Sequence, residues 1–116
     1  MEYTSVWTDR KGNQHFSFDL ADSFYPQFYL TDKDGTTVNL TGIASTLYIR
    51  KSRFEAVLIQ KTCINLDQTT NTGKSVVVVT TLDIEDTLSI GTYEYEIKFD
   101  VATSQAKVKR GMIVVR

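Results

Sequence analysis

The sequence predicts an all-β fold, a sandwich or a barrel, and three observations support this prediction. Thr, Val, Ile, Tyr, Phe and Trp supply 48 of the 116 residues, and their branched or aromatic side chains pack well on a pleated sheet. Short apolar stretches are separated by turn-forming residues at fairly regular intervals. The chain has one Pro and no amphipathic pattern of about three helical turns.

The N-terminal residues 1–21 are expected to form a hairpin or an extended arm, and residues 22–116 are expected to form the β-sandwich. Two strand-like stretches, 3–8 and 15–20, flank residues 11–13, which include a Gly and an Asn and therefore favour a turn. The chain shows no linker and no internal repeat, and its charge is evenly divided along its length.

A second hairpin is predicted between the apolar stretch 24–30 and residues 36–40. The intervening residues 32–35 are Asp-Lys-Asp-Gly, and Asp and Gly tolerate the positive φ angles of tight turns. Asp32 and Asp34 also resemble part of a calcium loop, but such a loop needs about five further oxygen ligands. The turn is therefore the favoured interpretation.

The middle of the chain predicts further strands. Residues 43–50 alternate between apolar and polar side chains, as expected of a strand with one face in the core. Residues 71–73 form a turn signal between the strand-like stretches 62–66 and 74–80. Residues 76–79 are all Val, which indicates either a strand covered on both faces or an edge strand pressed against a partner.

The C-terminal part contains the clearest strand, residues 92–100, where aromatic and Ile side chains alternate strictly with polar ones. Residues 81–88 are acidic at their start and are followed by Gly91, a pattern typical of one or two helical turns. Gly111 interrupts the last apolar stretch, 107–115, as a bulge or a turn would.

The charge balance excludes several classes of function. Lys and Arg number 13 and Asp and Glu number 14, so the chain lacks the excess basicity that nucleic-acid-binding proteins use to release counterions. No apolar run approaches the roughly 20 residues that cross a bilayer. The first ten residues lack the basic-then-apolar pattern of a secretory signal. We expect a chain made in the cytosol, with neither nucleic acid nor membrane as its partner.

Catalytic, metal and cofactor sites are not expected, and we predict that the protein is not an enzyme. His15 and Cys63 are the only His and Cys of the chain, too few for a metal site of the usual ligands and distant from one another in sequence. His15 is expected to face solvent, and Cys63 is expected to be a small buried hydrophobe. Glu94 and Glu96 are expected on the exposed face of their strand, where nothing raises the pKa of a carboxyl group.

Aromatic residues concentrate at the N-terminus, where 8 of the 13 occur within the first 29 positions. A free arm of this composition would expose a large apolar patch, so it is expected to dock either on a neighbouring subunit or on its own domain. In addition, residues 3–8 or 76–79 could pair with the sheet of another chain. The candidate interface residues are Tyr3, Trp7, Phe16, Phe18, Tyr25 and Tyr29.

Three motifs follow one another along the chain: Asp32-Lys33-Asp34-Gly35, Leu40-Thr41-Gly42 and Gly91-Thr92-Tyr93-Glu94-Tyr95-Glu96-Ile97. Taken in order, they resemble the immunoglobulin-like domain of tailed-phage structural proteins, in particular the N-terminal domain of baseplate upper proteins and related tail and neck proteins. The similarity covers roughly residues 22–116. It implies an immunoglobulin-like antiparallel sandwich of about seven strands without catalytic residues. It also implies core positions for Tyr93 and Tyr95 and a last strand at residues 113–115.

The resemblance implies a structural component of a bacteriophage virion, in the tail, neck or baseplate, that is made in the host cytoplasm. Its partners would be other virion proteins, in a homo-oligomer or a symmetric hetero-assembly. Two alternatives remain open at this point. One is a capsid decoration or head-fibre protein, and the other is a carbohydrate-binding adhesion module that stacks sugars on Trp7, Tyr25 or Tyr29.

Overall fold

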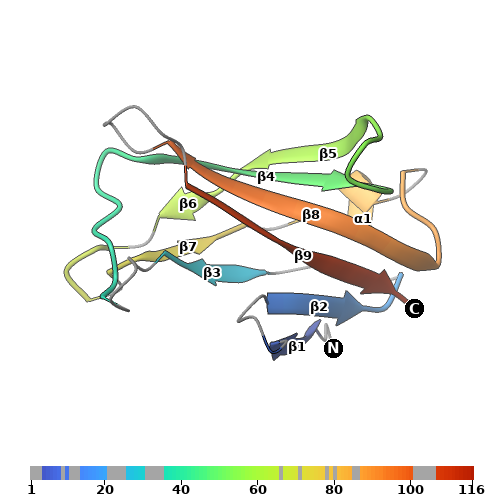
Figure 1. Cartoon of the computed structure of the whole chain (residues 1–116), viewed down its shortest axis with the longest axis horizontal. Coiled ribbons are helices and arrows are strands. Elements are labelled where there is room, and N and C mark those ends of the chain that lie inside the picture. The colour runs from blue at the N-terminus through green and yellow to red at the C-terminus, as the bar shows by residue number, and fades with distance from the viewer. Residues whose placement is uncertain are drawn as a thin grey trace.

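The protein is an all-β sandwich, as predicted from its composition and periodicity (Figure 1). The computed structural model describes residues 4–8, 10, 14–20, 26–30, 36–65, 67–70, 72–77, 79, 81–84, 87–100 and 107–116. The larger sheet has the strand order β1 (Thr4–Thr8), β2 (Gln14–Phe18), β9 (Lys107–Val115), β8 (Gly91–Asp100), β4 (Ala44–Arg50) and β5 (Val57–Thr62). The smaller sheet has the order β3 (Gln27–Tyr29), β7 (Lys74–Val76) and β6 (Ile64–Asn65).

The strand order follows that of immunoglobulin sandwiches. When the strands are lettered in chain order from β3 as B, the smaller sheet reads B-E-D and the larger sheet contains G-F-C-C′, which is the variable-type arrangement. Among the described residues of 22–116 there are seven strands, β3 to β9, as expected, and the N-terminal strands β1 and β2 extend the larger sheet beyond β9. One pair is also not antiparallel, since β2 runs parallel to β9.

The N-terminal hairpin is present, and it is built into the sandwich. β1 and β2 pair antiparallel from Thr4 opposite Phe18 to Thr8 opposite Gln14. Phe16 of β2 lies within 5.5 Å of both Phe28 and Tyr95, measured between ring centroids, and Phe28 lies 5.4 Å from Tyr95. Phe28 belongs to the smaller sheet, whereas Phe16 and Tyr95 belong to the larger one. These three rings therefore pack the hairpin against the opposite sheet.

The two strands with the clearest alternation form as predicted. In β4, Leu47 and Ile49 are fully buried, and in β8 every second residue from Tyr93 is buried. The core between the sheets contains the following residues: Phe16, Phe18, Phe28, Leu30, Leu40, Leu47, Ile49, Ile59, Cys63, Val77, Val79, Ile84, Leu88, Tyr93, Tyr95, Ile97, Phe99, Ile113 and Val115.

Three local predictions need correction. The valine run is not at an edge, because β7 ends at Val76 as the central strand of its sheet and Val77 and Val79 are buried. Residues 36–40 form no extended strand, although the Leu40 side chain is fully buried. Gly111 is neither a bulge nor a turn, since β9 passes through it with unbroken pairing to β8.

The remaining predictions concern turns and the short helix. Thr81–Ile84 forms one helical turn, α1, at the start of the segment for which such a turn is predicted. The turn before β7 contains Gly73 at a φ of 80°, a conformation that glycine adopts without strain. The predicted hairpin turn at residues 32–35, including its resemblance to a calcium loop, lies outside the described residues.

Candidate functional site

Of the six candidate interface residues, only Trp7 has a side chain shown to be exposed. Its exposed fraction is 40%. Phe16 and Phe18 have exposed fractions of 0%, so they are core residues and not interface residues. They pack on the chain's own domain. Docking there and docking on a neighbouring subunit are the two outcomes expected for an aromatic arm. Tyr3 and Tyr25 lie outside the described residues, and of Tyr29 only the backbone, in β3, is described.

Trp7 occupies the least protected edge of the two sheets. β1 is the outermost strand of the larger sheet and has the sequence Thr-Ser-Val-Trp-Thr, without a charged residue or a Pro. Natural edge strands are normally kept from pairing with other chains by charges, prolines, bulges or shortness. The opposite edge strand, β5, carries Lys61 and a register shift beside it, and the outer strands of the smaller sheet, β3 and β6, are only three and two residues long.

The exposed tryptophan rests on His15. The two residues are paired in register, and their ring centroids lie 5.5 Å apart at an interplanar angle of 34°. His15 is buried, contrary to the expectation of a solvent-facing side chain, and its Nδ1 accepts a hydrogen bond of 2.9 Å from the backbone N–H of Met112. Nδ1 is therefore the unprotonated nitrogen. The only histidine of the chain thus holds β9 beside β2 and supports Trp7.

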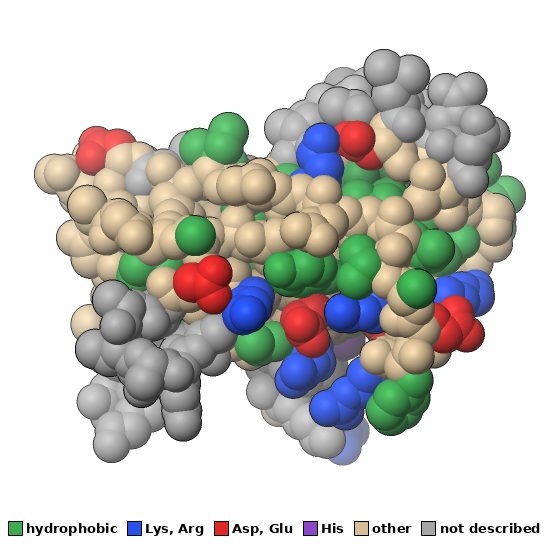
Figure 2. All heavy atoms as spheres, turned by 90° about the horizontal axis from the view of Figure 1, so that it is seen from above, with side chains coloured by type: hydrophobic (Ala, Val, Ile, Leu, Met, Phe, Trp, Pro, Cys, Tyr) green, Lys and Arg blue, Asp and Glu red, His purple; other side chains and the backbone are tan. Residues whose placement is uncertain are grey.

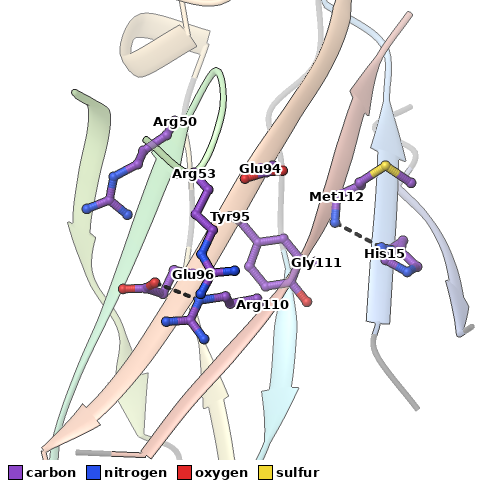
Figure 3. A pocket seen from close by; sticks show the side chains of 9 residues that line it. All are labelled: His15, Arg50, Arg53, Glu94, Tyr95, Glu96, Arg110, Gly111 and Met112. Carbon is purple, nitrogen blue, oxygen red and sulfur yellow. Dashed lines mark hydrogen bonds and ion pairs between the residues drawn. The ribbon is translucent and has the colours of Figure 1, made fainter. Parts of the chain in front are cut away.

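A second contact joins these strands next to the histidine. The Tyr95 hydroxyl donates a hydrogen bond of 2.7 Å to the Gln14 carbonyl oxygen. Its ring lies beside Gly111 (Figure 3), and a Cβ atom at Gly111 would come within 2.5 Å of that ring and 2.1 Å of the Gln14 oxygen. Glycine is therefore required here by the close approach of two neighbours and not by a turn.

Beside this junction, the outer face of the larger sheet has an open hollow of about 250 Å³ (Figure 3). Figure 2 shows acidic and basic side chains interleaved around the histidine on this face. The sheet register creates the pattern, because Arg50 lies opposite Glu94 and Glu96 lies opposite Arg110. The hollow is lined by His15, Arg50, Arg53, Glu94, Tyr95, Glu96, Arg110, Gly111 and Met112.

The charges of the hollow are only partly paired. Arg110 Nε lies 3.0 Å from Glu96 Oε2, and the Arg50 guanidinium lies 5.8 Å from the centre of the Tyr48 ring. Arg53 and Glu94 form no ion pair with any residue that the structure describes. The glutamates are thus part of a mixed-charge surface.

Sequence reasoning missed the loop that borders the hollow. Residues 51–56 join β4 to β5, and the Phe54 side chain in this loop is 93% exposed. Val57 and Leu58, at the start of β5, are also exposed. The sequence does contain a signal of this exposure. Phe54 lies between Arg53 and Glu55 and belongs to no alternating pattern that would bury it.

Cys63 is buried as expected, and burial raises the pKa of its thiol to about 11. A neutral buried thiol is a poor nucleophile.

Among the described residues, no group of three or more His, Cys, Asp or Glu side chains could hold a metal ion. In the described part of the chain, no helix is long and apolar enough to span a membrane.

No protein-family model matches the chain, and no curated protein matches it. The resemblance of its motifs to those of phage immunoglobulin-like domains accordingly stays a prediction.

Proposed function

We propose that the protein is a structural component of a tailed-phage virion, in the tail, neck or baseplate, and that it acts by docking on neighbouring virion proteins. The observation that carries this proposal is the uncharged outer strand β1 with exposed Trp7. The resemblance of the motifs in residues 22–116 supplies the biological setting, and the immunoglobulin order of the strands is consistent with it.

The proposed mechanism is strand addition. An extended segment of the neighbouring protein pairs with β1, and its backbone bonds to the N–H and C=O groups of β1 that point away from β2. Trp7 adds an apolar anchor on one face of the enlarged sheet. Tryptophan is common among the residues that dominate binding energy, because it buries a large area while few torsions are ordered.

Competition during virion assembly tests this proposal. Trp7→Ala and wild-type protein would be supplied together to a phage that lacks its own copy, and the ratio of the two in purified particles would be measured by mass spectrometry. Loss of a central anchor costs about 2 kcal/mol, so the variant is expected to be depleted at least tenfold. Ile64→Ala is the matched control, because Ile64 is 65% exposed but lies in the smaller sheet.

Equal incorporation of Trp7→Ala and wild type would contradict the proposed anchor. The same particles also separate a tail, neck or baseplate position from the alternative of a capsid decoration or head-fibre protein. A shell component would be present in many tens of copies or more, whereas a tail ring would contain few. Copy number by quantitative mass spectrometry decides between the two positions.

A further inference from the structure

The β4–β5 hairpin, whose Arg53 lines the hollow, carries exposed apolar side chains. Phe54 is 93% exposed in the loop between β4 and β5, and Val57 and Leu58 follow it with exposed fractions of 36% and 41%. Single exposed apolar residues are common on soluble proteins, but these three are close in sequence on one hairpin. Phe54 directly follows Arg53, whose side chain lines the hollow (Figure 3). A protruding apolar side chain and a recess therefore lie next to each other.

The hollow is large enough for an aromatic ring. Its volume is about 250 Å³, whereas a cavity of about 150 Å³ accommodates benzene. The lining includes the Met112 side chain, which suits an aromatic guest, and arginine side chains, which stack on aromatic faces. Phe54 is almost fully exposed and so does not fill the hollow of its own chain.

The unpaired charges around the hollow are complementary to the same charges on a second copy of the chain. Arg50, Arg53 and Glu94 all line the hollow, and none of them forms an ion pair with a described residue; Arg50 lies over the Tyr48 ring. Glu96 and Arg110 already neutralise one another. A partner of a single charge sign would leave either these arginines or this glutamate opposed by a like charge. A surface that offers both signs can place its arginine against the glutamate of a second identical surface, and its glutamate against the arginine of that surface.

We propose that this face binds a second copy of the chain about a two-fold axis. Phe54 of each copy enters the hollow of the other copy, and Arg53 of each copy faces Glu94 of the other. Such a contact uses the same patch on both molecules, which is the arrangement that closes a dimer. The proposal goes beyond the virion function and does not depend on it. Strand addition uses the outer backbone edge of β1, whereas the dimer contact uses side chains of the β4–β5 loop and of the hollow.

Sedimentation velocity over a wide range of protein concentration tests the proposal. Wild-type protein is expected to shift from monomer to dimer. Phe54→Ser, Arg53→Glu and Glu94→Arg are each expected to raise the dissociation constant at least tenfold, with circular dichroism unchanged because the altered side chains lie at the surface. Ile90→Ser is the matched control, because Ile90 is 70% exposed and is not among the residues that line the hollow.

The two charge variants also permit a rescue experiment that a general loss of surface complementarity would not reproduce. Each variant alone places two like-charge pairs in the dimer. In a mixed dimer, the Arg53→Glu copy is acidic at both positions and the Glu94→Arg copy is basic at both. Both contacts between the two copies then join an acidic to a basic side chain. The mixture is therefore expected to dimerise although each component alone does not.

Three results would overturn the inference. The first is a wild-type protein that stays monomeric up to roughly 1 mM. The second is a dimer that Phe54→Ser leaves unchanged, and the third is a mixture of the two charge variants that remains monomeric. Failure of this inference is thus distinguishable from failure of the proposed role of β1, which is read from incorporation into particles.

Discussion

The Tyr95 hydroxyl donates a hydrogen bond of 2.7 Å to the Gln14 carbonyl oxygen and so joins two strands that are 81 residues apart in sequence. The parallel ladder between β2 and β9 begins two residues later, at Phe16 opposite Ile113. Between these points, His15 Nδ1 accepts the Met112 N–H. Side chains thus complete the backbone hydrogen bonding where the N-terminal hairpin meets the rest of the sheet.

Tyr95→Phe tests this junction. The substitution removes the donor to a partly buried carbonyl, and the expected loss in the free energy of unfolding is about 1 kcal/mol. Urea denaturation followed by tryptophan fluorescence measures it. Tyr48→Phe is the control, because the Tyr48 hydroxyl forms no hydrogen bond with a described residue, and a change within about 0.5 kcal/mol is expected there. Equal effects of the two substitutions would contradict the assigned contact.

Gly111→Ala is expected to destabilise the protein by about 1 to 3 kcal/mol, because the new methyl group would collide with the Tyr95 ring and with the Gln14 carbonyl. Gly42→Ala provides a comparison with a different cause. A Cβ at Gly42 meets nothing within 4 Å, but its φ is +76°, so about 1 kcal/mol of backbone strain is expected. A Gly111→Ala protein as stable as wild type would show that no close approach exists at this position.

The N-terminal hairpin is expected to be indispensable for folding. Phe16→Ala should lower the free energy of unfolding by about 3 to 5 kcal/mol, since the ring is fully buried among Phe28 and Tyr95. Many domains have only about 5 to 15 kcal/mol in total. Deletion of residues 1–19 should therefore abolish the cooperative unfolding transition. A truncated chain with a normal transition would show instead that the hairpin is a separate arm.

Alternation along single strands made much of this fold predictable. The side chains of β4 and β8 are buried in the order that their period of two predicts, and Tyr93 and Tyr95 lie in the core. The placement of the first 21 residues could not be predicted in this way. Whether Phe16 and Phe18 face a neighbour or their own core depends on the parallel pairing of β2 with β9, which is a contact between the two ends of the chain.

The candidate surface was predictable only in part. Exposure of Trp7 and the open edge at β1 agree with the reasoning from an aromatic N-terminus and an unprotected strand. The hollow depends on the register that sets Arg50 opposite Glu94, and periodicity gives the face of a residue but not its cross-strand neighbour. The need for glycine at position 111 could not be predicted for the same reason, because it depends on Tyr95 of the adjacent strand.

The Cys63 thiol gives a prediction of pH dependence. Burial raises its pKa from 9.0 to about 11 in the folded protein, so the folded state holds this proton more tightly than the unfolded state. The thiol's contribution to stability is complete below pH 9 and is lost as the pH rises through about 11. The difference in stability between wild type and Cys63→Ala should therefore shrink from pH 9 to pH 11 in urea titrations. A constant difference would contradict the shifted pKa.

The same burial should protect the thiol from modification. At about pH 8, iodoacetamide should alkylate Cys63 slowly in the folded protein and rapidly in urea, as measured by intact mass. Comparable rates in the two conditions would mean that the region around Cys63 is open in solution.

Amide hydrogen exchange, measured in the free protein and in assembled particles, tests most directly whether the protein acts through the outer edge of β1. The amides of Thr4–Thr8 that point away from β2 have no strand partner in the described sheet of the free protein. Their exchange is expected to slow at least tenfold in the particle, where a neighbouring strand would bind them. Unchanged exchange along β1, together with protection that appears elsewhere on the surface, would contradict this role of β1.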